Sequence, residues 1–486
     1  TRRSSDLGSD NLFYSRRIGR NPQGYPDVSN ASVDVPQNTT ILGAAKFSGK
    51  TKSGWSIGLL SSITDREYAK IDVNGERSRA LVEPLTSYGV ARMQKDFNNR
   101  NSYIGWIFTS TVRDLQGDEL NFLRKNAYSG GVDFKHNWKN RKYYFTGNFV
   151  TSRVEGSKEA IKLTQTSLTH LFQRVDAGHV NVDPNRTSLT GTGGKLEIGK
   201  SSEGHWRYNY LGMWRSPELE LNDVGFLRQA DEIRQYGIVT YQTLKPFGKF
   251  RKAFFRNETF VTHDFDGNYN RFQNTTLAEF NLKSNWNINA QVVYKPRIYT
   301  NTILQGGPRF RYSPENFQSI NFNSDSRKKL NFYGGIYYSQ GKDDSFSYLE
   351  YDAGFNYRPI NALTISFSPN LSKNVSKTQY VTQTDYNGTT RYIMANLNQR
   401  TLSTSIRIDY SINPNLTVQY YGQPFISRGR YNNFNRVVDA RAKYYGDRIA
   451  LYQPNQIAFD AASNSYAFDE NTDGTADYSI GNPDFS

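Results

Sequence analysis

The stretch LSTSIRIDYSI at residues 402–412 decides the fold of this chain, because apolar and polar side chains alternate along it without a break. Successive side chains of a β-strand point to opposite faces of its sheet. One face would carry Leu402, Thr404, Ile406, Ile408, Tyr410 and Ile412, and the other Ser403, Ser405, Arg407, Asp409 and Ser411. The pattern predicts a long strand with one apolar face and one polar face.

The same alternation recurs in other parts of the chain, and the segments that carry it are long. It is clear at 206–214, 286–294, 349–357 and 363–372, and the longest strand-like segments are 80–97, 101–115, 391–412 and 415–430. Strands of soluble proteins usually have about 5–6 residues, whereas a strand needs about 9–11 residues to cross a bilayer. The lengths therefore indicate strands that span a membrane.

The composition agrees with membrane-spanning strands and excludes several other classes of protein. The 486 residues have an aromatic content of 14%, a mean hydropathy of −0.72 and no cysteine. A disordered chain would be poor in aromatic residues, and a helical membrane protein would need apolar runs of about 18 residues, which do not occur. A β-barrel reconciles many aromatic residues with low hydropathy, because only alternate side chains face lipid. Without cysteine, disulfides and cysteine-based metal sites are excluded.

The connections between the alternating segments fall into short and long classes. The short ones are at 50–54, 98–101, 139–141, 201–204, 246–248, 284–286, 325–328, 358–361 and 413–415, and the long ones at 63–79, 115–124, 155–188, 216–231, 376–390 and 431–480. Short periplasmic turns and long extracellular loops are typical of outer-membrane barrels. We therefore predict an all-β fold, a closed transmembrane antiparallel β-barrel, with about 18 strands visible in this chain.

The predicted organisation is a lead-in segment followed by one barrel. Residues 1–38 are expected to be periplasmic or plug-like, and residues 39–486 to form the barrel. In 157–175, apolar residues recur near helical spacing after a candidate N-cap, Ser157. We expect a loop helix near 157–172, on the rim or folded into the lumen, with an irregular loop as the alternative. Residues 431–480 are expected to form one long acidic loop.

The formal net charge of +15 is spread along the chain and not gathered into a patch. A nucleic-acid-binding protein should show a basic patch with stacking aromatic residues, so no nucleic-acid partner is expected. Basic loops beside anionic lipid head groups, or a basic lumen, fit the scatter better. Lys135 and Arg407 are expected to face inward, so an open lumen should prefer anions.

Motifs of enzymatic chemistry are weak. The run GTGGK at 191–195 lacks the first glycine of a phosphate-binding loop, and Leu196 follows its lysine where Ser or Thr is needed. Glu350 and Asp352 would lie about 7 Å apart on one strand face, a spacing compatible with an inverting glycosidase pair, but ordinary lumen polarity explains them better. Glu218 and Glu220 give the same weak signal in a loop. We predict that the protein is not an enzyme, with a hydrolase as the alternative.

The segment DENTDGTAD at 469–477 has the spacing of a small calcium-binding loop. Asp469, Asn471, Asp473 and Asp477 would supply side-chain oxygens, and Gly474 would allow the sharp turn between them. These four residues are the predicted metal site, with calcium as the candidate ion. The alternative is an ordinary surface turn rich in Asp and Gly.

Five segments together resemble an uncharacterised family of Gram-negative envelope proteins, DUF5916. They are NLFYSRRIGRNPQGYP (11–26), ILGAAKFSGKTKSGWSIG (41–58), LVEPLTSY (81–88), GGVDFKHNW (130–138) and FDENTDGTADYSIGNPDFS (468–486). Members of this family commonly carry an N-terminal domain similar to family 9 carbohydrate-binding modules, followed by an outer-membrane barrel. The resemblance implies the outer membrane of a Gram-negative bacterium as the location, and it implies a functional role for Arg16, Arg17 and Arg20. From the residues alone, these arginines are equally the basic end of a first strand or of a plug.

Two parts of the family pattern are missing from the sequence, which are the domain similar to carbohydrate-binding modules and the closing strands after NPDFS. We therefore expect these residues to be a fragment, or the barrel to be completed by other segments. The leading functional hypothesis is a pore or transport component for glycans or anionic solutes. The alternatives are an anchor barrel within a larger envelope complex and a barrel enzyme acting on lipid or glycan. Outer-membrane lipid and lipopolysaccharide are the expected surroundings.

Overall fold

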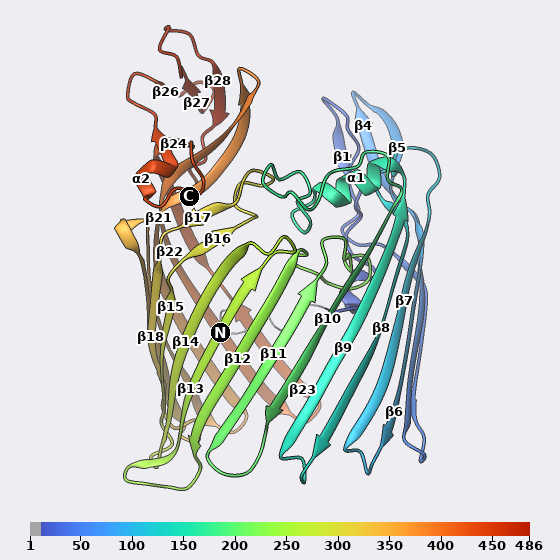
Figure 1. The fold of residues 1–486 in the computed structure, drawn as a ribbon, viewed down its shortest axis with the longest axis vertical. Coiled ribbons are helices and arrows are strands. Elements are labelled where there is room, and N and C mark those ends of the chain that lie inside the picture. Colours follow the sequence, from blue (N-terminus) through green and yellow to red (C-terminus); the bar gives the residue numbers. More distant parts are fainter. Residues whose placement is uncertain (1–10) are drawn as a thin grey trace. The chain divides into compact units, whose positions relative to one another are not determined.

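The computed structural model describes residues 11–486, and Figure 1 shows their strands. These residues divide into two compact units. The first unit holds residues 11–203, 209–236 and 262–269, and the second holds residues 204–208, 237–261 and 270–486. Of the predicted lead-in segment 1–38, residues 1–10 lie outside the described part. Among the described residues, no helix is long and apolar enough to cross a membrane.

The first unit is built from antiparallel strands that follow one another along the chain. They are β1 (Ser32–Asp34), β2 (Ile41–Lys50), β3 (Trp55–Thr64), β4 (Glu67–Val73), β5 (Glu76–Glu83), β6 (Leu85–Phe97), β7 (Ser102–Asp114), β8 (Arg124–Trp138), β9 (Tyr143–Gly156) and β10 (Ser188–Lys200). β2, β3 and β6 to β10 pair in sequence, while β1, β4 and β5 form a small separate sheet. The turn between β2 and β3 needs Gly54, whose φ is 90°; a side chain there would be strained.

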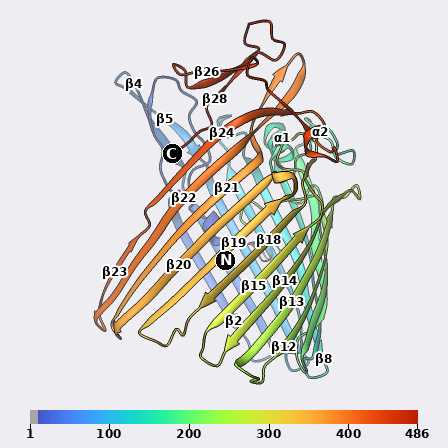
Figure 2. The ribbon, with the colours of Figure 1, turned by 90° about the vertical axis from the view of Figure 1, so that its left-hand side faces the viewer.

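Four strands have residues in both units, and the remaining strands belong to the second. The four are β11 (Trp206–Arg215), β12 (Glu232–Thr243), β13 (Phe250–His263) and β14 (Tyr269–Leu282). The others are β15 (Asn287–Lys295), β16 (Ile298–Thr300), β17 (Phe310–Tyr312), β18 (Glu315–Asn323), β19 (Leu330–Gly341), β20 (Phe346–Ile360), β21 (Leu363–Tyr386), β22 (Thr389–Asn413), β23 (Leu416–Gly422), β24 (Phe425–Val437), β25 (Ile449–Leu451), β26 (Ile457–Asp460), β27 (Ser465–Phe468) and β28 (Tyr478–Gly481). Strands β18 to β22 pair in order, and the long neighbours β20 to β24 lie side by side in Figure 2.

The fold class predicted from the alternation is confirmed. The described chain is all-β, and its long strands pair antiparallel as in transmembrane β-barrel proteins. The long strands number eighteen when β23 and β24, which both pair with β22, are taken as one interrupted strand. Closure of the barrel stays a prediction. Every residue of β2 is exposed, and so is β23 up to its last residue, as expected of edge strands.

Each long strand has one apolar face that is exposed and one polar face. On β7, Ile104, Trp106 and Phe108 are exposed, whereas Thr109 and Thr111 on the other face are buried. The exposed apolar residues also line up across neighbouring strands of the second unit. One such row is Ile320, Ile336, Tyr351, Leu371, Leu402 and Ile426, joined by the register of β18, β19, β20, β21, β22 and β24. Exposed apolar rows of this kind are the lipid-facing surface of a membrane barrel.

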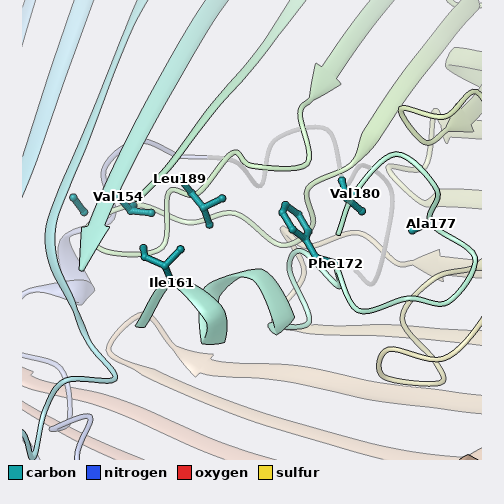
Figure 3. Packing of buried hydrophobic residues seen from close by; sticks show 7 residues of the cluster. Val154, Ile161, Phe172, Ala177, Val180 and Leu189 are labelled. Carbon is teal, nitrogen blue, oxygen red and sulfur yellow. The ribbon is translucent and has the colours of Figure 1, made fainter. Parts of the chain in front are cut away.

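A packed core lies at the long-loop end of the first unit, around the helix α1 (Lys158–Thr166). Figure 3 shows Ile161 of this helix beside Val154 of β9 and Leu189 of β10, and Phe172 and Val180 of the following loop complete the cluster. The Ser157 side chain accepts a hydrogen bond from the backbone N–H of Ala160, which caps the helix. The helix ends earlier than the expected 172, because Ser167 has an extended backbone and the chain leaves the helix there.

Residues 431–480 do not form the single long loop that the sequence suggested. They contain the end of β24, the short helix α2 (Tyr445–Arg448), β25 and a three-stranded antiparallel sheet of β26, β27 and β28. An aromatic core holds this sheet against β22 and β24. It consists of Ile393, Ala395, Phe434, Tyr452, Phe468 and Ile480, with Tyr466 and Tyr478 packed around it. This sheet could not be predicted from the sequence, because its aromatic residues are widely spaced within an acidic segment.

The facing of β21 and β22 can be tested by placing a charge on each face. Phe367 and Ile406 are cross-strand partners on the exposed apolar face, whereas Ser405 lies on the polar face. We expect Ile406→Arg to impair insertion into lipid vesicles by about 2–4 kcal/mol, because an arginine near the bilayer midplane is poorly solvated. Ser405→Arg, one residue away, should insert nearly as well as the unchanged protein. Heat-dependent gel mobility after refolding measures both, and equal behaviour of the two variants would contradict the facing.

Candidate functional site

In the first unit, the polar face of β7 to β10 is covered at the long-loop end by chain segments that fold onto it. The N-terminal segment 11–26 pairs with the β11–β12 loop, since Asn11 and Phe226 exchange backbone hydrogen bonds of 3.0 and 2.7 Å. The Arg17 guanidinium donates to the backbone oxygen of Gly225 at 3.1 Å. The same loop reaches β9, where the Glu220 backbone N–H donates to the Ser152 hydroxyl at 3.0 Å.

Two glycines allow these close approaches. A Cβ on Gly191 of β10 would lie 2.1 Å from the backbone nitrogen of Leu219, and a Cβ on Gly225 would lie 2.2 Å from the backbone oxygen of Asn11. Neither neighbour is a side chain that could move away. The glycine at 191, which begins the run GTGGK, thus serves loop packing and not phosphate binding.

A buried ionic cluster lies where these segments meet. We use this name for Arg20, Glu83, Arg113, Arg124, Glu220 and Asp223. Asp223 accepts from Arg113 at 2.8 Å and from Arg124 at 3.0 Å, and the exposed fractions of the Arg113 and Asp223 side chains are 1% and 5%. Arg124 also lies 3.5 Å from Glu220. The six groups carry three positive and three negative formal charges, so the net formal charge of the cluster is zero.

The surroundings of Glu220 and Arg20 in the cluster shift the pKa of both side chains. Burial would raise the pKa of Glu220, but Arg124 and a hydrogen bond from His170 outweigh it and lower that pKa to about 2. The pKa of Arg20 is lowered by burial and by repulsion from Arg113. Glu220 therefore stays ionised at every physiological pH, and protonation of its carboxyl would remove the charge that Arg124 and His170 face.

A second buried set of charges fixes the α1 loop. Asp231 accepts from Arg174 at 3.2 Å, from His179 at 2.9 Å and from the Phe265 backbone N–H at 3.0 Å. Arg174 and Asp231 are 1% and 6% exposed at their side chains. Removing one partner of a buried charged pair is costly because the other charge stays unpaired. The two loops therefore form one fixed cover over the polar strand face.

The geometry of the ionic cluster suits holding chain segments together better than catalysis. Its two loop acids, Glu220 and Asp223, are both paired with arginines. Of the two loop acids flagged by the sequence, Glu220 belongs to the cluster and Glu218 does not. The arginine partners could not be recognised from the sequence, because Arg113 and Asp223 are 110 positions apart. Arg17 and Arg20, which the resemblance marked, both lie in this region.

A different polar surface lines the second unit. We call it the amide face, formed by Asn289, Asn321, Asn331, Glu350, Asn356, Ser366 and Asn370 on β15 and β18 to β21. The side chains bind one another across strands: Asn370 donates to Glu350 at 2.7 Å, Ser366 to Asn356 at 2.7 Å and Asn356 to Asn331 at 3.0 Å. Glu350, one of the predicted acidic pair, also accepts from the Tyr348 hydroxyl.

The predicted calcium residues lie between β27 and β28 and bind the backbone of their own loop. Asp469 accepts from the backbone N–H groups of Asp473 and Gly474 at 3.2 and 2.8 Å, and Asp477 accepts from that of Glu470 at 2.6 Å. Asn471 donates to Asp473 at 3.0 Å. Within residues 11–486, no cluster of three or more His, Asp or Glu side chains is arranged to hold a metal ion. Calcium binding stays a prediction. It requires the carboxylate oxygens of the loop to turn from the backbone N–H groups toward one common centre.

Long antiparallel strands with one exposed apolar face and one polar face define a protein of the transmembrane β-barrel class. The model of the family described as "Domain of unknown function (DUF5916)" matches residues 7–469, nearly the whole chain. The chain therefore belongs to this family, and the resemblance drawn from its sequence motifs is confirmed. No curated protein sequence is significantly similar to the chain.

Several solved structures have a similar arrangement of strands at low sequence identity. An anion-selective porin from Comamonas acidovorans matches with 13% identity and a TM-score of 0.30, over 68% of this chain and 91% of the porin. The FrpB iron transporter from Neisseria meningitidis matches with 10% identity and a TM-score of 0.34, over 84% and 75%. OccAB4 from Acinetobacter baumannii matches with 10% identity and a TM-score of 0.31, over 79% and 99%. At these values the likeness carries no argument about substrate.

The role of the ionic cluster in fixing the cover is testable by removing one acid. We expect Asp223→Ala to destabilise the 216–231 loop by about 3–5 kcal/mol, because Arg113 and Arg124 would lose their carboxylate. Hydrogen exchange of the Gly225 and Phe226 amides, which donate to Leu221 and Asn11, measures the loss directly. Asp118→Ala, in an exposed loop of the same unit, should leave these amides protected. Unchanged exchange in the Asp223 variant would show that apolar packing alone holds the cover.

The calcium prediction is tested on the full chain in detergent. Millimolar calcium should slow proteolysis within 469–477, because a cation bridging the carboxylates would restrain the loop. Asp473→Ala should abolish the calcium response, whereas Asp460→Ala, in the neighbouring β26–β27 turn, should retain it. If calcium does not change the proteolysis of the unchanged protein, the segment is an ordinary surface turn.

Proposed function

We propose that this chain is a pore or transport component of the outer membrane of a Gram-negative bacterium and that its solutes are glycans or other hydroxyl-rich molecules. The observation that carries the proposal is the amide face. Asparagine, serine and carboxylate side chains both donate to and accept from hydroxyl groups. A surface of such groups, repeated over neighbouring strands, offers a sugar chain many equivalent partners along its path.

The charges on the same face favour neutral solutes over anions. The expected inward cation Arg407 donates to Asp409 at 2.8 Å, and Lys295 lies 2.9 Å from Glu315. A cation that is paired with a carboxylate attracts an anion only weakly, because the fields of the two opposite charges nearly cancel away from the pair. The formal charge of +15 therefore supports anion preference less well than the sequence alone suggested. Anionic solutes remain the alternative that the experiment below distinguishes.

The cover in the first unit fits a transport role as well. A fixed loop on the polar strand face would narrow a solute path and select by size, while the wall behind it stays unchanged. Loops anchored by buried charges hold one shape, and a narrow path needs that shape to be constant. The proposal does not include catalysis, because the two loop acids of the ionic cluster, Glu220 and Asp223, are held by arginines.

The proposal is tested by ion current through the full protein in planar lipid bilayers. A neutral linear oligosaccharide should interrupt the current at millimolar concentration. The double variant Asn356→Ala and Asn370→Ala should raise the half-blocking concentration roughly tenfold, because about two hydrogen bonds to sugar hydroxyls are lost. The matched control, Tyr357→Phe and Leu371→Val, changes the adjacent residues on the opposite face and should leave the block unaltered.

Two outcomes would contradict the proposal. One is the absence of any current from the inserted protein, which would support an anchor barrel. The other is a current that oligosaccharides do not interrupt and whose reversal potential strongly favours anions, which would support transport of anionic solutes.

A further inference from the structure

Three cations form a row across neighbouring strands of the second unit. Lys373 of β21 is the cross-strand partner of Arg400 of β22, and Arg400 is the partner of Arg428 of β24. All three side chains are exposed. Neighbouring strands lie about 4.8 Å apart, so the three positive charges are held side by side along one line. We call this line the cationic row.

The cationic row borders the exposed apolar face of the same strands. Two residues earlier on β21, Leu371 pairs with Leu402, which pairs with Ile426. These three side chains are 50%, 52% and 71% exposed. From Leu363 to Leu371 the apolar positions of β21 span nine residues, within the about 9–11 that cross a bilayer. The cations thus stand where the apolar band ends, about 6.6 Å beyond its last row.

The direction of β21 identifies the end of the band. The strand begins at Leu363, directly after the short turn that joins it to β20, and Lys373 lies farther along toward the long-loop end. Short turns are periplasmic and long loops extracellular in outer-membrane barrels. The cationic row is therefore at the level of the lipid head groups in the outer leaflet.

None of the three cations has an ion pair among residues 11–486. The contrast with nearby arginines on the same strands is clear, since Arg407 has Asp409 at 2.8 Å and Arg430 has Asp484 at 2.9 Å. Like charges directly opposite one another on adjacent strands destabilise a sheet. An anion placed against the row would remove this repulsion, and none of the acidic residues within 11–486 forms an ion pair with it.

We propose that the cationic row binds the phosphate groups of an anionic lipid of the outer leaflet. Arginine forks bind phosphate with two parallel hydrogen bonds, and lysine adds a point charge. The adjoining leucine and isoleucine row would contact the acyl chains of the same molecule. A soluble anion could use the cations but would gain nothing from the exposed apolar row, and an acidic protein segment would have to displace lipid from it. The proposal rests on the membrane-spanning fold and not on transport.

The test uses the full chain in detergent and, as the probe, a bisphosphorylated acylated disaccharide followed by native mass spectrometry. We expect the triple variant Lys373→Gln, Arg400→Gln and Arg428→Gln to bind the probe roughly 100-fold more weakly, because each cation near a lipid surface contributes about a fivefold factor. Removal of both phosphates from the probe should weaken its binding to the unchanged protein to a similar degree.

The matched control removes the same charge at the other end of the strands. Lys328, Lys329 and Arg358 are exposed at the short-turn end, and their triple replacement by glutamine should retain the lipid. Equal losses in both triple variants would show general charge attraction and overturn the proposal. Two other results would also overturn it, namely inorganic phosphate displacing the lipid at equal concentration, or an acidic peptide binding the row in place of lipid. Insertion into vesicles, measured for both variants, confirms that each is folded.

Discussion

The pairing of backbone amides and carbonyls is the constraint on which the rest of this structure depends. In hydrocarbon, an unpaired backbone group costs several kcal/mol, so strands that cross a membrane must each have partners. The long antiparallel ladders from β6 to β10 and from β18 to β22 meet this requirement. Once the ladder is fixed, alternation alone decides which side chains meet lipid and which meet the polar side.

The polar side is used differently in the two units. In the first unit it is covered by chain segments that bring arginines and acids together away from water, and the balance of charge in the ionic cluster makes that burial tolerable. In the second unit, the polar face carries amides and hydroxyls that bond to one another across strands. A fixed cover and a hydrogen-bonding wall are separate properties, and each can be altered without the other.

The sequence predicted the strands well because their signal is local. Leu402 to Ile412 alternate within one strand, and neither length nor facing depends on distant residues. The ionic cluster could not be predicted, because its signal is not local. Arg113, Arg124 and Asp223 are far apart in the sequence and meet only after the loops fold back. The segment 469–477 shows a third case. Its Asp and Asn spacing suggested calcium, but spacing alone does not show that Asp469 and Asp477 accept from their own backbone.

The amide face and the cationic row both include β21, and they lie on its opposite faces. Asn370 and Lys373 differ by an odd number of positions, so they point to opposite faces of β21. A slip of β21 by one residue against its neighbours would turn Leu371 toward the polar side and Asn370 toward the lipid. The apolar rows oppose such a slip, because only the observed register places the apolar side chains against lipid. The contact with lipid that fixes the fold therefore also decides which polar groups lie on the amide face and which lie in the cationic row.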